Sequence, residues 1–231
     1  MSGPVNVGTT VFGLKYKDGV MFAADTSITY GSMLKIKNGK RIEQVGDETI
    51  IACSGEMADF QNIVKQMNEK HEADFIENDG ATFFHPRDYF NWVARTQYQR
   101  RLKMDPLLVS GLVGGINPKT KEVFLGKSNP HGTKLEADWF ITGLGDHYCQ
   151  VLFQNKWRAD MTEQEAVALI EECIRILFIR DKKAADHVQI ATVTHQHGPR
   201  IGEAYKVPAS LDYQAFYDRT NEFYRPMRIR Y

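Results

Sequence analysis

The sequence contains few cysteines, and they show no pairing pattern. Three occur in 231 residues, Cys53, Cys149 and Cys173, each in an apolar stretch and none within a CxxC motif. An odd number of widely spaced cysteines does not make a disulfide framework, and it favours buried, reduced thiols. We therefore expect an intracellular protein whose core has no covalent cross-links.

The sequence also lacks a charge excess, a long apolar run and a phosphate-binding loop. Its 29 basic and 29 acidic residues balance to zero, which argues against a nucleic-acid partner because phosphate binding needs excess lysine and arginine. No apolar run approaches the roughly 18 residues of a membrane span, and residues 1–8 are too short and polar for a signal peptide. The glycine-rich stretch 111–115 leads into Asn117-Pro118 and not into a helix. We expect no membrane contact and no cofactor.

What the sequence does contain is a strong β-hairpin close to its start. Residues 9–16 are rich in β-branched, aromatic and apolar side chains, and Asp18-Gly19 is a typical hairpin-turn dipeptide. Residues 20–24 form an uninterrupted apolar run, and Asp25 closes it. The pattern predicts two central, buried strands.

The remaining elements alternate between strand groups and helix pairs. Residues 26–40 are polar and contain turn signals, so they are predicted to form a loop. Thr162 and Glu165 form a capping box, which marks the start of the clearest helix. Further strands are expected at 41–45, 49–53, 107–115, 123–125, 139–141, 188–193 and 201–207, and further helices from Met57 to about His71, from Pro86 to before Pro106, and from near Asp146.

This order predicts the fold class α+β. Helices that come in pairs between groups of strands can cover the two outer faces of two stacked antiparallel sheets, which makes a four-layer αββα sandwich. No repeat, low-complexity tract or linker interrupts the chain, so residues 1–231 are predicted to form a single domain.

Several segments carry a resemblance to a known family. The Gly8-Thr9 start, GVMFAAD at 19–25, SGEMADF at 54–60 and RILFIRD at 175–181 resemble proteasome β-type subunits, which are N-terminal-nucleophile hydrolases. The segments YGS at 30–32, MADFQ at 57–61, RRLKMDPL at 100–107 and QIATVT at 189–194 most resemble the non-catalytic type at the seventh position of the β ring. The resemblance implies the αββα sandwich of that family.

Catalytic members use an N-terminal threonine, whose hydroxyl attacks while its own amine, with a pKa of about 8, takes the proton. The resemblance places Thr9 at the nucleophile and Asp25 at the first aspartate, whereas Arg41 stands at the lysine position. A guanidinium stays protonated at neutral pH and cannot shuttle a proton as an ammonium can. The site is therefore predicted to be degenerate.

Two further positions lack the hydroxyls that the family motif carries. The serine expected between two glycines is Leu144, and the serine expected three residues after Asp181 is Ala184. Constellation members act as a unit, so partial activity is not expected. We expect residues 1–8 to stay attached as a short extension and no residue of this chain to act as a catalyst.

The resemblance implies a structural subunit of the 20S proteasome core, which serves ubiquitin-dependent protein degradation in the cytoplasm and nucleus. Its partners would be other α and β subunits in four stacked seven-membered rings, with this chain in an inner ring. One alternative is an active threonine endopeptidase with Thr9 as nucleophile after removal of residues 1–8. A third interpretation is a free-standing homo-oligomeric hydrolase.

The last residues, 208–231, form a tail rich in aromatics and arginine, which are typical interface anchors. An alternating terminus would fray without a partner, so we expect residues 225–231 to bind subunits of the facing ring. Whether residues 211–216 pack on their own domain or on a partner stays open. The predicted partner-binding residues are Phe223, Tyr224, Arg225, Met227, Ile229 and Tyr231.

Overall fold

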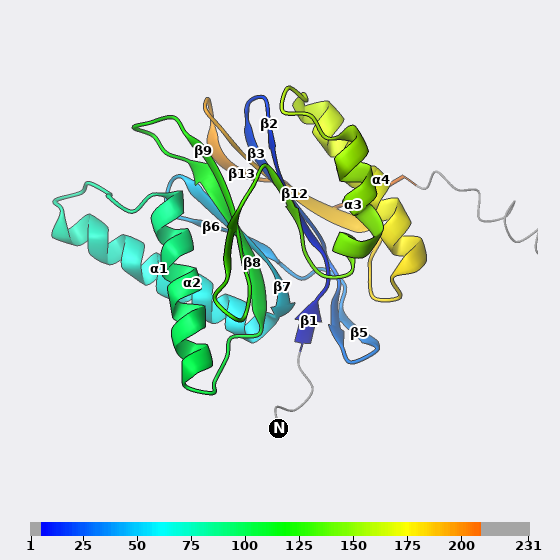
Figure 1. Ribbon diagram of the computed structural model, residues 1–231, viewed down its shortest axis with the longest axis horizontal. Helices are drawn as coiled ribbons and strands as arrows, with labels where there is room; N and C mark the ends of the chain where they lie inside the picture. The colour runs from blue at the N-terminus through cyan, green and yellow to red at the C-terminus, as the bar shows by residue number, and fades with distance from the viewer. Residues whose placement is uncertain (1–5, 209–231) are drawn as a thin grey trace, which may run out of the picture.

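The protein was analysed as a computed structural model, which describes residues 6–208 (Figure 1). The predicted partner-binding residues lie outside the described residues: Phe223, Tyr224, Arg225, Met227, Ile229 and Tyr231. Within the described range, no helix is long and apolar enough to cross a membrane.

Residues 6–208 form two antiparallel sheets and four helices. The eight-stranded sheet contains β1 Asn6–Gly8, β4 Ile28–Tyr30, β5 Met33–Ile36, β6 Ile42–Val45, β7 Thr49–Glu56, β8 Val109–Ile116, β9 Val123–Ser128 and β10 Lys134–Glu136. The six-stranded sheet contains β2 Val11–Tyr16, β3 Gly19–Asp25, β11 Trp139–Ile141, β12 His187–Thr194, β13 Gly198–Ile201 and β14 Tyr205–Lys206. The helices are α1 Met57–Glu77, α2 Pro86–Leu102, α3 Gly145–Lys156 and α4 Glu163–Arg180.

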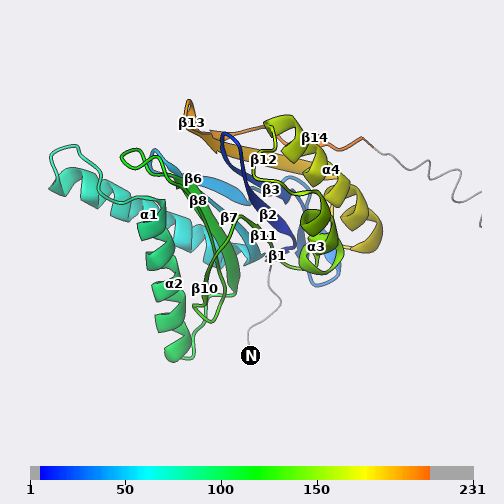
Figure 2. The same ribbon diagram turned by 45° about the horizontal axis from the view of Figure 1, so that its top comes forward.

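Figures 1 and 2 show the helix pairs on opposite sides of the stacked sheets, which confirms the four-layer αββα sandwich. One core cluster packs α1 and α2 on the eight-stranded sheet, and Phe60 and Phe90 are members of it. A second cluster packs α3 and α4 on the six-stranded sheet, with Phe12 against Phe153. A third, which includes Phe22 and Leu112, lies between the sheets.

The expected hairpin near the start is confirmed and is the centre of the smaller sheet. Strands β2 and β3 pair from Val11 opposite Ala24 to Tyr16 opposite Gly19. Strand β3 is buried along its whole length because its side chains alternate between the core cluster under α3 and α4 and the cluster between the sheets, while β2 and β12 pair with its edges. Asp25 is the last residue of β3, so the pairing of this strand with β12 fixes the position of the Asp25 side chain.

The structure differs from the prediction in the polar stretch 26–40, which contains the hairpin β4 and β5. The turn expected at residues 30–32 is there, with Gly31 at φ +61°, but its flanks are strands. Strands β4 and β5 are only three and four residues long and lie among turn signals, so they are too short for a periodic pattern to identify them. Within the described range this hairpin joins the large sheet through β1, which pairs with β4 on one side and β7 on the other.

Several element boundaries also differ from the prediction: the strands expected at 49–53 and 123–125 run on to Glu56 and Ser128. Helix α1 continues past His71 to Glu77, because its last turns are held by a carboxylate and not by an apolar face: Asp74 accepts from the amides of Phe83 at 2.6 Å and Phe84 at 3.1 Å. The strand expected at 201–207 is two short strands, β13 and β14, which both pair with β12.

Candidate functional site

Thr9 and Asp25 meet where β1 passes into β2. Thr9 is half-buried in the two-residue link between these strands, and its Oγ1 donates to Asp25 Oδ1 at 3.4 Å. This distance is long for a hydroxyl donor, so the contact is weak. Thr9 and Asp25 are sixteen residues apart in the sequence, and the pairing of β2 with β3 brings their side chains together.

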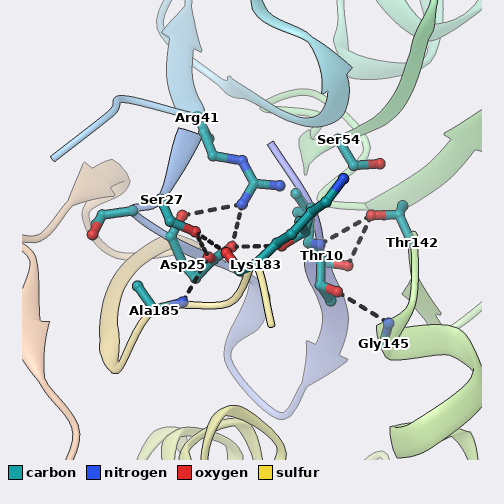
Figure 3. Close-up of polar contacts among 12 residues, drawn as sticks. Thr10, Asp25, Ser27, Arg41, Ser54, Thr142, Gly145, Lys183 and Ala185 are labelled. Carbon is teal, nitrogen blue, oxygen red and sulfur yellow. Dashed lines mark hydrogen bonds and ion pairs between the residues drawn. The ribbon is translucent and has the colours of Figure 1, made fainter. Parts of the chain in front are cut away.

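Arg41 fills the space beside Asp25 and is fully buried (Figure 3). Its Nη1 forms an ion pair with the Asp25 carboxylate and bonds the Asp25 carbonyl at 3.1 Å. Its Nε and Nη2 donate to the Cys53 carbonyl at 3.3 and 3.1 Å. The planar fork of a guanidinium, with donors on three nitrogens, suits this two-sided role.

The second oxygen of Asp25 is also occupied (Figure 3). Ser27 Oγ lies within hydrogen-bond distance of Asp25 Oδ2 and of the Lys183 carbonyl, the latter at 2.7 Å, and its one proton serves one acceptor at a time. The Ala185 amide donates to the same carboxylate oxygen at 3.1 Å. Asp25 is therefore a buried structural anion surrounded by donors.

Gly8 is the residue that makes room for the arginine. It lies in β1 opposite Ile28 and Gly55, and a Cβ built on it would be 2.3 Å from Arg41 Nε. A side chain at this position would displace the guanidinium. The Gly-Thr pair at the start of the motif thus has a packing reason as well as a chemical one.

A loop from the second half of the chain closes the other side of Thr9. Gly143, at φ +62°, is so close that its Cβ would lie 2.9 Å from the Thr9 carbonyl. The Gly145 amide donates to Thr10 Oγ1 at 3.0 Å (Figure 3). Leu144 is 45% exposed at the start of α3, and its side chain carries no hydroxyl.

Asp181 and Ala184 lie in the turn that follows α4. Asp181 is buried; its Oδ1 accepts from the Lys183 amide at 2.9 Å, but its Oδ2 has no hydrogen-bond partner among residues 6–208. The Ala184 amide donates to the Asp181 carbonyl at 3.0 Å, and the methyl group of Ala184 offers no donor. This turn reaches Asp25 through the Ala185 amide and not through either predicted side chain.

Burial also inactivates the thiol nearest the arginine. Cys53 is fully buried, and burial raises the pKa of its thiol to about 12, even though the Arg41 charge favours the thiolate. At neutral pH it is a neutral, inaccessible group. The Cys53 thiol therefore does not substitute for Thr9 as a nucleophile.

Comparisons with known proteins agree with this architecture. The family model described as proteasome subunit matches residues 5–193. The chain belongs to the proteasome subunit family. This membership confirms the resemblance that the sequence motifs indicated, and the match includes β1 as well as Thr9.

Proteasome subunits from distant organisms are similar over most of the chain. Proteasome subunit beta type-4 of Arabidopsis thaliana is 33% identical over 94% of this chain and 87% of its own length. Proteasome subunit beta type-4 of Xenopus laevis is 33% identical, over 83% and 78%. A probable proteasome subunit beta type-7 of Encephalitozoon cuniculi is 32% identical, over 89% and 92%.

Sequence reasoning about this proteasome family member missed several site residues. Ser27 gave no signal beyond lying two residues after Asp25, and Thr142, whose Oγ1 accepts from the Val11 amide at 3.0 Å, is separated from its partner by most of the chain. Gly8 was identified only as the residue before Thr9. Each of these contacts needs the folded arrangement of β1, β2 and the two loops.

Proposed function

We propose that this chain is a non-catalytic, structural β subunit of the 20S proteasome core, a single domain that forms part of an inner ring. The names of its relatives, proteasome subunits beta type-4 and beta type-7, support this assignment. In this role it supports assembly and ring contacts for ubiquitin-dependent degradation in the cytoplasm and nucleus, while proteolysis is carried out by other β subunits.

The observation that carries the proposal is the placement of β1. Residues 6–8 pair with β4 and β7, so cutting the bond before Thr9 would free a central strand of the eight-stranded sheet. While that bond is intact, the Thr9 nitrogen is an amide and cannot accept a proton. We infer that residues 1–8 are retained as structure and are not removed.

The chemistry around Thr9 supports the same conclusion. Arg41 is committed to Asp25 and the Cys53 carbonyl, and it cannot act as a neutral base at physiological pH. Losing the acid-base function of one such group costs about 10² to 10⁴ in rate. With Leu144 and Ala184 also lacking hydroxyls, the positions Thr9, Asp25, Arg41, Leu144, Asp181 and Ala184 form a degenerate constellation under this proposal.

Intact mass of the chain from purified particles tests the proposal. Retention of Ser2–Gly8 is expected, because β1 is part of the sheet. A chain that begins at Thr9, or a covalent threonine-directed inhibitor attached to Thr9, would instead establish the alternative of an active endopeptidase. Gel filtration of the chain expressed alone checks the third interpretation, a free-standing homo-oligomeric hydrolase.

For the tail we propose contacts with subunits of the facing ring through residues 225–231. The alternating Met227-Arg228-Ile229-Arg230-Tyr231 supports strand-like pairing with a partner. Deleting residues 225–231 should lower the yield of full particles relative to half particles in native mass spectrometry. A normal yield of full particles would contradict this role of the tail.

A further inference from the structure

A basic cavity lies beside the degenerate site and is not used by it. It has a volume of about 860 Å³ and lies between the β4 and β5 hairpin and the turn after α4. Ser27 and Ala185, which touch Asp25, form part of its wall, as does Phe178 of α4. This volume falls within the range of ligand-binding pockets.

The cavity has an excess of positive charge. Four lysines line it, Lys37, Lys40, Lys182 and Lys183, and none of them has an ion-pair partner among residues 6–208. Two carboxylates also line it, but Asp186 is already engaged, with Lys206 at 3.1 Å and His187 at 2.7 Å. In the described lining, Glu203 is the one carboxylate without a salt bridge. The four lysine ammonium groups therefore leave the cavity with a net positive charge.

The rest of the wall combines apolar side chains with uncharged polar ones, among them Ser32 and Asn38. Leu34 and Phe178 are 48% and 41% exposed at the cavity. The Thr26 hydroxyl donates to the Lys37 carbonyl at 2.7 Å, and the Ser27 hydroxyl is taken up by Asp25 Oδ2 and the Lys183 carbonyl. Ammonium groups next to exposed apolar side chains suit a ligand that is both acidic and partly apolar.

The edge of the large sheet adds a way to hold a peptide. Strand β5 ends the order of the eight-stranded sheet, and within residues 6–208 it pairs only with β4. An edge strand leaves a row of main-chain donors and acceptors that an extended chain can use. Leu34 of β5 lines the cavity, so the edge and the lysines border the same space.

We propose that this cavity is a docking site for an extended acidic segment of a neighbouring subunit, with Asp or Glu side chains placed among Lys37, Lys40, Lys182 and Lys183. The proposal rests on the chain being part of an assembled particle, as proposed above. Main-chain pairing along β5 would give the segment its register, and the lysines would select its charge. Leu34 and Phe178 would cover its apolar side chains.

Zero-length cross-linking of intact particles tests the proposal. A carbodiimide activates a carboxyl group, the lysine amine displaces the resulting urea, and an amide forms with the net loss of one water from the protein pair. Peptide sequencing should then find Lys37, Lys182 or Lys183 joined to an Asp or Glu of another subunit. Links only to Glu203 or to residues 209–231 of the same chain, or no links at these lysines, would overturn it.

Charge reversal gives an independent measurement. The double substitution Lys37→Glu and Lys182→Glu changes exposed side chains, so folding should be unaffected, and incorporation into particles should fall about tenfold or more when co-expressed with the unmodified chain. The matched control is Lys17→Glu with Lys103→Glu, which reverses two exposed lysines away from the cavity. Equal incorporation of both variants overturns the docking site alone, whereas absence of even the unmodified chain from particles overturns the proposed function too.

Discussion

The buried pair of Arg41 and Asp25 offers the most direct test of the site. Substituting Arg41→Met keeps much of the buried stem but leaves the Asp25 carboxylate without its cation and the Cys53 carbonyl without two donors. Removing one partner of a buried ion pair costs about 3 to 5 kcal/mol. For a chain of this size that corresponds to a fall in Tm of roughly 6 to 20 °C.

Urea unfolding of the full-length chain, followed by tryptophan fluorescence, measures this cost. Trp139 and Trp157 pack against the core of the six-stranded sheet, so their emission reports the loss of that core. The control is Arg101→Met, the same change at an exposed position, which should alter the free energy of unfolding by less than about 0.5 kcal/mol.

A double-mutant cycle separates the pair from the packing of each side chain. Asp25→Asn combined with Arg41→Met removes both charges, so it should cost less than the sum of the two single substitutions, with a coupling of about 1 to 3 kcal/mol. If Arg41→Met costs under about 1 kcal/mol, or if the two substitutions are additive, the charges are not paired in a buried environment and the account of the site fails.

Three further predictions follow from other contacts. Gly8→Val should destabilise the chain by about 1 to 3 kcal/mol, because its Cβ would meet Arg41 Nε at 2.3 Å, and an unchanged urea midpoint would contradict this packing. Ala184→Ser should raise stability by about 0.5 to 1.5 kcal/mol by giving Asp181 Oδ2 a donor, whereas Ala185→Ser should not. The buried Cys53 thiol, with its pKa of about 12 against about 9 unfolded, loses its proton first in the unfolded chain, so stability should fall as pH rises from 9 to 12 and fall less in Cys53→Ala. Native-state labelling of Cys53 by iodoacetamide at pH 8 would refute its burial.

Much of the fold could be predicted from the sequence, because periodicity reports which face of an element is buried. The hairpin of β2 and β3 and the capping box of Thr162 and Glu165 followed from local patterns, and the structure contains both. The hairpin of β4 and β5 was missed because its strands are only three and four residues long, too short for a periodic pattern to mark them. The last turns of α1 were missed for a related reason, since Asp74 and not an apolar stripe holds them.

The candidate site was predictable as a set of residues but not as a network. The motif located Thr9, Asp25 and Arg41, and these three meet in the structure. Apart from the Ser27 hydroxyl, their other partners are main-chain groups, namely the Cys53 carbonyl and the Ala185 amide, which carry no residue-specific signal. Such contacts depend on how loops approach one another, so they appear only when the fold is known.

The position of β1 has a consequence for how this chain is made. Five of the eight strands of the larger sheet, β1, β4, β5, β6 and β7, lie within the first 56 residues, as does the β2 and β3 hairpin of the smaller one. About a quarter of the chain therefore holds the start of both sheets, and three of its pairings, β2 with β3, β4 with β5 and β6 with β7, are local hairpins that favour rapid formation. These strands can pair during synthesis, before either helix pair has left the ribosome. The later strands β8 and β12 then pair with the free edges of β7 and β3.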